Sequence, residues 1–220
     1  MTSFTIARKN RVIRVPERGR YDTATIYSII DEALICHVGF VQDGQPFVIP
    51  TLHVRRHDEL LLHGATASRL MRHVQAGNEV CVTISIVDGI VLAKAACKHS
   101  VNYRSVALFG KGKLVDSDSD KLLALESFTE KIMPGRWADV RKPTAQEILA
   151  TTIVSITIAE ASAKIRTGPP KDVDEDIKLP VWAGVLPLRQ MALAPISAAY
   201  TDGTMSVPEY VTDYNRTLSD

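Results

Sequence analysis

Cysteine is scarce in this sequence, and the number of cysteines is odd. Cys36, Cys81 and Cys97 are the three cysteines among 220 residues. A small, odd set of this kind does not indicate a disulfide framework. Two of the three lie in apolar runs that predict strands, where a free cysteine packs as a small hydrophobic side chain. We therefore expect the chain to fold on an ordinary hydrophobic core, for which 45% hydrophobic residues provide the material.

An excess of charge of one sign is absent as well. Lysine and arginine total 26 against 25 aspartates and glutamates, which leaves a net charge of +1 and no bulk attraction to nucleic acid. No stretch approaches the roughly eighteen apolar residues of a membrane span. The basic first twenty residues also lack the apolar run of a signal peptide. These absences predict a cytoplasmic protein without a nucleic-acid or membrane partner, which binds a small molecule or another copy of itself.

Several sequence signatures of catalytic and nucleotide-binding sites are missing. No glycine-rich dinucleotide fingerprint follows a strand, and there is no Walker loop. No G-x-S-x-G elbow occurs, although a hydrolase triad stays open because geometry defines it. The histidines lack the matched pairs of a zinc site, so we predict scattered hydrogen-bonding side chains and no metal. The six histidines are residues 37, 53, 57, 63, 73 and 99.

Residues 49–70 are the stretch around which the chain is organised. Residues 47–55 alternate between apolar and polar side chains, which predicts a half-buried strand, and 59–63 form the return strand. Thr66 is the predicted N-cap of the following helix, with Ser68 and Arg69 in the first turn. Free amides, the helix dipole, a hydroxyl and a guanidinium would converge there, as a phosphate site requires. The alternative is a cap that binds no ligand.

The remaining pattern favours an all-antiparallel fold. Asp43-Gly44 and Asp88-Gly89 are hairpin signals, and glycines 110 and 112 predict a bend or a close approach within a strand. About six closely spaced strands with few helices favour an antiparallel barrel or sandwich. We predict a polar loop at 98–105, and the tail after Arg189 shows no sustained period of either kind and is left unassigned. The other predicted elements are helices at 22–33, 117–132 and 143–150, and strands at 34–41, 79–87, 90–96, 105–115 and 151–165.

Seven short motifs occur in one order across residues 17–190. They are Glu17–Asp22, Ile49–Leu52, Leu62–Ala65 leading to Ser68-Arg69, His99–Val106, Pro134–Trp137, Lys164–Pro170 and Pro180–Pro187. Through them the sequence resembles the pyridoxamine 5′-phosphate oxidase-like family of FMN-binding split barrels. The likeness is to its flavin-nucleotide-binding branch, which is related to nitroimidazole-resistance reductases. The predicted domain spans 17–190, between a basic arm at 1–16 and a C-terminal extension at 191–220.

The resemblance implies a six-stranded antiparallel split barrel with peripheral helices. It also implies a homodimer that holds FMN in grooves between the two barrels. Ser68 and Arg69 would bind the phosphate, in agreement with the site expected from the helix start. The other positions implied for the cofactor are Pro50 and Thr51 at the isoalloxazine edge, His63, Gly64 and Ala65 at the ribityl chain, and His99, Ser100, Asn102, Tyr103, Arg104 and Ser105 completing the pocket.

The implied activity is a flavin-dependent oxidoreductase that passes electrons between a reduced donor, such as NADH or NADPH, and a small acceptor. Trp182 resembles a tryptophan near the flavin, and it either closes the substrate side or packs at the dimer interface. Arg189 is followed by Gln190-Met191 instead of the Arg-x-His pattern of authentic pyridoxamine phosphate oxidases, so vitamin B6 oxidation is not expected. The alternatives are a flavin carrier or sensor without turnover, and a haem-binding split barrel.

Overall fold

The computed structural model describes residues 2–214 of the chain, and strands dominate it. The helices and 3-10 turns in this part are η1 (Pro16–Arg18), α1 (Thr23–Glu32), α2 (Arg69–Gln75), η2 (Ala96–Lys98), α3 (Asp118–Ile132), α4 (Arg136–Asp139), α5 (Ala145–Ala150), α6 (Asp174–Ile177) and α7 (Glu209–Thr212). The strands are β1 (Gly19–Arg20), β2 (Ile35–Gln42), β3 (Gln45–Arg56), β4 (Glu59–Ala65), β5 (Glu79–Leu92), β6 (Ser100–Leu114), β7 (Thr151–Thr157), β8 (Glu160–Arg166) and β9 (Gly184–Pro187).

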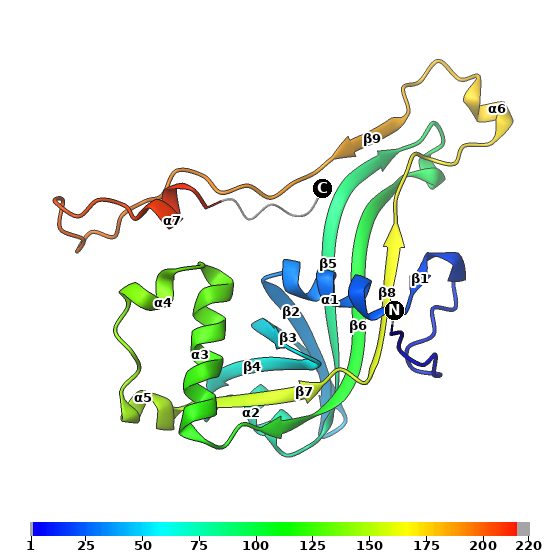
Figure 1. The fold of residues 1–220 in the computed structure, drawn as a ribbon. Helices are drawn as coiled ribbons and strands as arrows, with labels where there is room; N and C mark the ends of the chain where they lie inside the picture. Colours follow the sequence, from blue (N-terminus) through cyan, green and yellow to red (C-terminus); the bar gives the residue numbers. More distant parts are fainter. Residues whose placement is uncertain (1, 215–220) are drawn as a thin grey trace.

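Six of these strands close into a ring. The sheet runs β1-β8-β6-β7-β4-β3-β2-β5-β9. An additional pairing of β5 with β6 closes the six strands from β6 to β5 in this order into a ring. Every pairing is antiparallel. This ring confirms the predicted split barrel. Beyond it, β5 and β6 continue as a long curved ribbon that carries β9 on one edge and β8 on the other (Figure 1).

Two short helices complete the barrel core. Asp22, at the start of the helix predicted at 22–33, caps α1, since its carboxylate accepts a hydrogen bond of 2.8 Å from the Thr25 amide. The apolar faces of both helices join the side chains inside the barrel, and the two helices lie at opposite ends of it (Figure 1). Their buried residues are Ile26, Ile29 and Ile30 of α1, and Leu70, Met71 and Val74 of α2.

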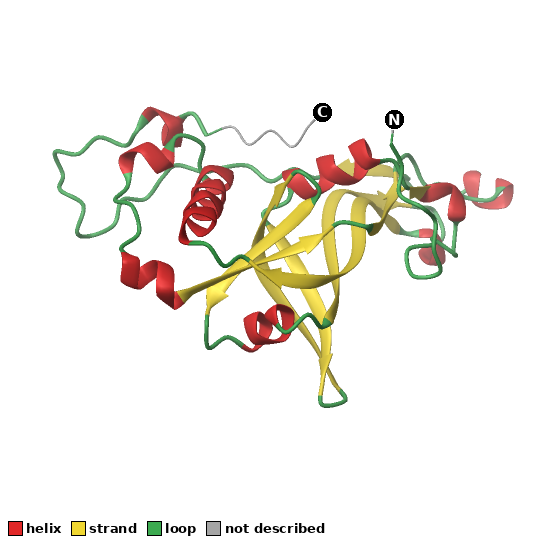
Figure 2. Ribbon diagram, turned by 60° about the horizontal axis from the view of Figure 1, so that its bottom comes forward, coloured by secondary structure: helices red, strands yellow, loops and turns green. Residues whose placement is uncertain are grey.

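A second, smaller core lies outside the barrel wall. Helix α3 begins at the predicted position, where the Ser117 hydroxyl accepts a hydrogen bond from the Asp120 amide. Its Ala124 and Phe128 pack with residues of β3, β4 and β7 on the outer face of the wall. Figure 2 shows this helix beside the strands. Among the helices of residues 2–214, none has the length and apolar character needed to cross a bilayer.

The predicted hairpin at Asp88-Gly89 is wrong. β5 passes through these residues as one strand, with an irregularity in its pairing to β6 between Val87 and Gly89. Gly89 does not have the positive φ of a hairpin turn, whereas Asp43 and Gly44 have φ values of 51° and 76° and do turn the chain. A Cβ on Gly89 would lie 3.0 Å from the carbonyl oxygen of Leu186, so glycine here permits the approach of β9.

Three other boundaries differ from the prediction. The segment 98–105 is mostly strand, because β6 begins at Ser100. The predicted strand at 151–165 is two strands, β7 and β8, with a tight turn between them. Ser68 occupies the N-cap of α2 in place of Thr66, whose hydroxyl instead donates to the Ala150 carbonyl at 3.1 Å. Tertiary partners at the end of α5 and the start of β7 therefore take the group that the sequence assigned to capping, since the Thr152 hydroxyl of β7 also donates to that of Thr66 at 3.1 Å.

Gly112 allows the end of α2 to contact β6 closely, as the glycine pattern predicted. A Cβ at this position would lie 2.0 Å from Val74 Cγ1 and 2.7 Å from the Val74 carbonyl oxygen. We expect Gly112→Ala to lower the free energy of unfolding by about 2 kcal/mol, because overpacking forces the backbone to shift. Gly203→Ala is the control, since nothing lies within 4 Å of its Cβ position. Equal urea midpoints for the two variants would contradict the close contact.

Candidate functional site

A cationic cleft of about 480 Å³ opens beside α2. Arg69, Arg72 and His73 line it from the helix, with Gln42 and Asn78 opposite. Residues three and four positions apart share one face of a helix, so the two guanidiniums and the imidazole face the same opening. Arginine presents a planar set of N–H donors that matches phosphate oxygens. The cleft is therefore suited to an anion that carries one or more phosphates.

An aromatic cleft of about 590 Å³ adjoins it and shares His73 and Asn78 with it. Phe40 and Phe47 stack with their ring centroids 5.4 Å apart, and the His73 ring lies 4.5 Å from that of Phe40. Cys81 also lines this cleft, and burial raises the pKa of its thiol. Aromatic walls of this kind bind flat ring systems by stacking.

Arg69 joins the two clefts. Its guanidinium lies over the Phe47 ring at 4.3 Å from the centroid, so one residue contributes both a positive charge and a flat surface. Ser68 precedes it, and its hydroxyl makes no capping hydrogen bond. The Ser68 amide donates to the Ala65 carbonyl at 2.8 Å, so this amide is not available to a ligand.

The residues expected from the barrel wall lie on two neighbouring strands. Pro50 and Thr51 of β3 pair with His37 and Cys36 of β2, and Pro50 is exposed. Residues 63–65 end β4 and lead directly into the Ser68-Arg69 segment. A Cβ on Gly64 would lie 3.1 Å from Met71 Cγ, so glycine allows α2 to pack against β4.

His63 is the half-buried histidine of that segment. Its ring packs on Phe128 of α3 with centroids 4.3 Å apart. Burial lowers the pKa of His63, because removal from water disfavours the charged imidazolium. Its Nδ1 atom is buried and has no hydrogen-bond partner in the described part of the chain. His63 is therefore a neutral imidazole held against the outer core.

The second group of expected residues lies far from the clefts within one chain. Asn102 is paired with Gly89 on the ribbon, whereas Gly110 is paired with Val80 at the aromatic cleft. Eight strand residues separate Asn102 from Gly110, which corresponds to about 27 Å. One copy of the chain thus does not bring Asn102 and the residues before it together with Arg69.

Several side chains of 99–105 are engaged in structural contacts. Arg104 holds Glu32 at the end of α1 and Asp88 on β5, and these carboxylates raise its pKa further above its ordinary value. Asn102 accepts from the buried Arg166 guanidinium and donates to the Gly168 carbonyl at 3.2 Å. The Ser105 hydroxyl donates to the Lys164 carbonyl, and Nδ1 of the exposed His99 lies 3.2 Å from the Ala95 carbonyl oxygen. Ser100 and Tyr103 are partly buried.

Trp182 also lies at the far end of the ribbon. It precedes β9, whose Gly184 pairs with Leu92 of β5, and it is 66% exposed. On β5, Thr83 pairs with His37 of β2, and His37 pairs in turn with Pro50 of β3. The nine residues from Thr83 to Leu92 span about 30 Å. Within one chain, Trp182 therefore does not cover the strand edge at Pro50.

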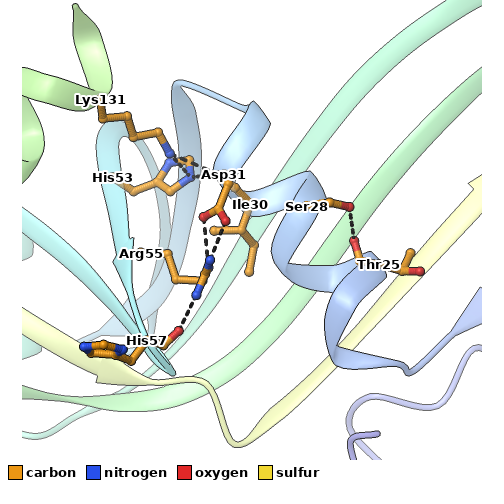
Figure 3. Close-up of polar contacts among 8 residues, drawn as sticks. All are labelled: Thr25, Ser28, Ile30, Asp31, His53, Arg55, His57 and Lys131. Atoms are coloured by element: carbon orange, nitrogen blue, oxygen red, sulfur yellow. Dashed lines mark hydrogen bonds and ion pairs between the residues drawn. The ribbon is translucent and has the colours of Figure 1, made fainter. Parts of the chain in front are cut away.

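A buried polar network fastens α1, β3 and α3 together (Figure 3). The Nε2 atom of His53 lies 2.8 Å from the Ile30 carbonyl oxygen, and Lys131 Nζ lies 3.1 Å from each of these two atoms. Arg55 pairs with Asp31 on the same side of the barrel. His53 is therefore a hydrogen-bonding core histidine, as the sequence predicted. In residues 2–214, no three histidine, cysteine or acidic side chains gather as a metal site.

Sequence reasoning missed most of the cleft. It identified Arg69 but not Arg72 and His73, although the helical spacing from Arg69 was available as a signal. Phe40 and Phe47 come from the hairpin of β2 and β3, and their nearness to α2 depends on how the barrel closes. No local pattern indicates that contact.

Comparison with known proteins identifies close structural relatives. The flavocytochrome Anf3 from Azotobacter vinelandii is 37% identical, with a TM-score of 0.88 over 94% of this chain and 96% of that chain. The FAD and heme binding protein from Mycobacterium smegmatis is 32% identical, with a TM-score of 0.85 over 89% and 96%. A protein from Bacteroides thetaiotaomicron, provisionally described as a 5-nitroimidazole antibiotic resistance protein, is 24% identical, with a TM-score of 0.56 over 67% and 86%. That third likeness concerns the fold alone.

The family assignment rests on sequence as well as on structure. A comparison with curated proteins finds no match. The sequence model of the family described as pyridoxamine 5′-phosphate oxidase matches residues 22–165, which include the whole six-stranded ring. The chain therefore belongs to the pyridoxamine 5′-phosphate oxidase family, as the seven motifs predicted.

Proposed function

We propose that this chain is a flavin-binding redox protein whose two adjoining clefts hold the flavin nucleotide. The observation that carries the proposal is Arg69, which lies over Phe47 in the aromatic cleft and lines the cationic cleft beside Arg72. A flavin nucleotide has a flat ring system joined to phosphate, and the two clefts offer one surface for each. The two structures above 30% identity support this, since one is described as a flavocytochrome and the other as binding FAD and heme.

The nucleotide that we propose is FAD, in preference to the FMN that the resemblance implied. Arg69 and Arg72 lie one helical turn apart, and two guanidiniums match a pyrophosphate better than a single phosphate. The Mycobacterium smegmatis protein is described as an FAD binder. Titrating the flavin-free protein with FMN and, separately, with FAD compares the two affinities. Tighter binding of FMN would favour the FMN that the resemblance implied. An unchanged visible spectrum with both nucleotides would overturn the flavin proposal.

The chain's own residues bind and orient the cofactor. Arg69 and Arg72 would neutralise the phosphates, Phe47 and Phe40 would support the flat ring, and the wall of β3 at Pro50 and Thr51 would limit access from one side. The bound flavin supplies hydride or electron transfer between a donor and a small acceptor. Anaerobic mixing with NADH or NADPH distinguishes an oxidoreductase, in which the flavin bleaches, from a carrier, in which no reductant bleaches it.

A second copy of the chain is part of this proposal. Asn102 lies about 27 Å along β6 from Gly110 beside the aromatic cleft, and the partner of Gly184 near Trp182 lies about 30 Å along β5 from the strand edge at Pro50. We propose that in a homodimer segment 99–105 and Trp182 approach the clefts of the partner subunit, where Trp182 would cover the substrate side. Trp182→Ala should then lower turnover while FAD binding is retained. A monomeric variant with weakened FAD binding would instead support interface packing.

Haem is the second candidate ligand, because both structures above 30% identity are described with haem or as a flavocytochrome. Haem iron is commonly held by histidine. His73 lines the aromatic cleft, and His57 lines a separate polar cleft beneath α3. Added haem should give a Soret band in the FAD-loaded protein, and its loss in His57→Ala or His73→Ala would identify the ligand. No Soret shift in the wild-type protein would overturn haem binding.

A further inference from the structure

The C-terminal strap, residues 188–207, crosses the outside of the molecule between two anchored ends. At its start the Leu188 amide donates to the Asp88 carbonyl at 3.0 Å, beside β9. Just beyond its end, the Tyr210 hydroxyl donates to Asp139 at 2.6 Å and accepts from Arg136 at 2.9 Å. Figure 1 shows the strap running from the ribbon toward α4 and α7, outside the barrel. It is a tethered span rather than a free tail.

The strap exposes large apolar side chains almost completely. Met191 is 80% exposed, Leu193 82%, Ile196 96% and Tyr200 93%. Arg189 and Asp202 are the charged residues among its twenty positions. An extended, nearly uncharged and apolar segment loses favourable burial if it stays in water. Its composition therefore indicates a surface that another molecule covers.

The exposed area is large enough for a stable dimer. Trp182, Val181 and Leu186 lie next to the strap and are 66%, 51% and 52% exposed. Together with the strap, they offer on the order of 1,000 Å² of apolar surface, at roughly 200 Å² for each large side chain when fully exposed. A standard interface buries about 800 Å² on each partner, and the largest apolar patch on a typical monomer is about 300–600 Å².

We propose that the strap packs on a second copy of this chain. The ribbon beside its first anchor exposes Val87, Ile90 and Val101, at 48%, 37% and 41%. In a two-fold dimer the strap of one copy would cover such a face on the other, and the contact would occur twice. A net charge of +1 gives little repulsion between copies. A lipid surface is less favoured, because Arg189 is the strap's one cation for headgroups.

The strap inference rests on the dimer in the proposed function, and light scattering tests the two separately. The full chain of 24.2 kDa should elute at twice that mass at micromolar concentration. Leu193→Glu with Ile196→Glu should weaken dimerisation by about 100-fold, which is about 2.8 kcal/mol. Both positions are exposed within one chain, so the thermal unfolding of the monomer should not change. The matched control, Gln190→Glu with Ser197→Glu, adds the same charge at exposed polar positions.

The possible outcomes distinguish the strap contact from the dimer itself. A dimeric double variant with wild-type affinity would overturn the role of the strap and leave the dimer intact. Equal weakening by the control pair would also overturn it, because charge alone would then be the cause. A monomeric wild-type chain that sediments with vesicles of neutral and anionic phospholipid would assign the strap to a lipid surface and overturn the proposal. A monomeric wild-type chain that does not sediment with them would overturn both the strap contact and the dimer, while flavin uptake is read independently by titration.

Discussion

Replacing Arg69 and Arg72 together by alanine is expected to weaken FAD binding by roughly a hundredfold to ten-thousandfold. A hydrogen bond to a charged group is worth roughly 1.5–3 kcal/mol, so two lost guanidiniums correspond to about 3–6 kcal/mol. Each 1.4 kcal/mol is a tenfold change in the dissociation constant. Arg69→Ala alone should cost about 1.5–3 kcal/mol of binding free energy. Quenching of flavin fluorescence or calorimetry on protein freed of flavin measures the change.

Arg69 contributes a positive charge and a planar group that stacks on Phe47, and a lysine substitution separates the two contributions. Arg69→Lys keeps the charge but removes the planar group that lies over the ring, so FAD affinity should fall between those of the wild-type protein and the alanine variant. Arg14→Ala is the charge-matched control, because Arg14 is exposed and lines neither cleft. If the control weakens FAD as much as Arg69→Ala does, general charge and not the cationic cleft attracts the nucleotide.

Arg104→Ala is expected to lower the free energy of unfolding by about 3–4 kcal/mol, the cost of breaking a buried ion pair on one side. The side chain of Glu32 is only 8% exposed, and Arg104 links it to Asp88. Without the guanidinium, two carboxylates face each other across the gap between α1 and β5. Urea unfolding followed by circular dichroism measures the loss.

The surface pair of Arg141 and Glu147 is the control for Arg104. Both pairs are fork-like arginine–carboxylate contacts, but Arg141 and Glu147 are 67% and 50% exposed. Arg141→Ala should therefore leave the free energy of unfolding nearly unchanged, because water screens an exposed ion pair. Arg104→Met combined with Glu32→Gln should recover much of the lost stability, because no unpaired charge remains at Glu32. If the two single variants are equally stable, the Arg104 network is not protected from water.

Local patterns were sufficient to predict much of the secondary structure. Asp22 and Ser117 cap helices where the sequence placed them, since a cap bonds within three residues of its own position. Alternating side chains predicted the strands of the ring, and the seven motifs predicted its closure as a split barrel. Arg69 was predicted as an anion ligand because its position at a helix start is a local property.

The two Asp-Gly dipeptides show where local information ends. Asp43-Gly44 turns the chain with positive φ, whereas the same dipeptide at 88–89 stays within a strand, because β6 and β9 both pair with β5 at that point. Phe47 and Arg72 meet at the clefts only because the ring brings the β2–β3 hairpin beside α2. Hydrogen bonding and burial between segments far apart in the chain override a dipeptide preference, and only the tertiary structure decides which segments meet.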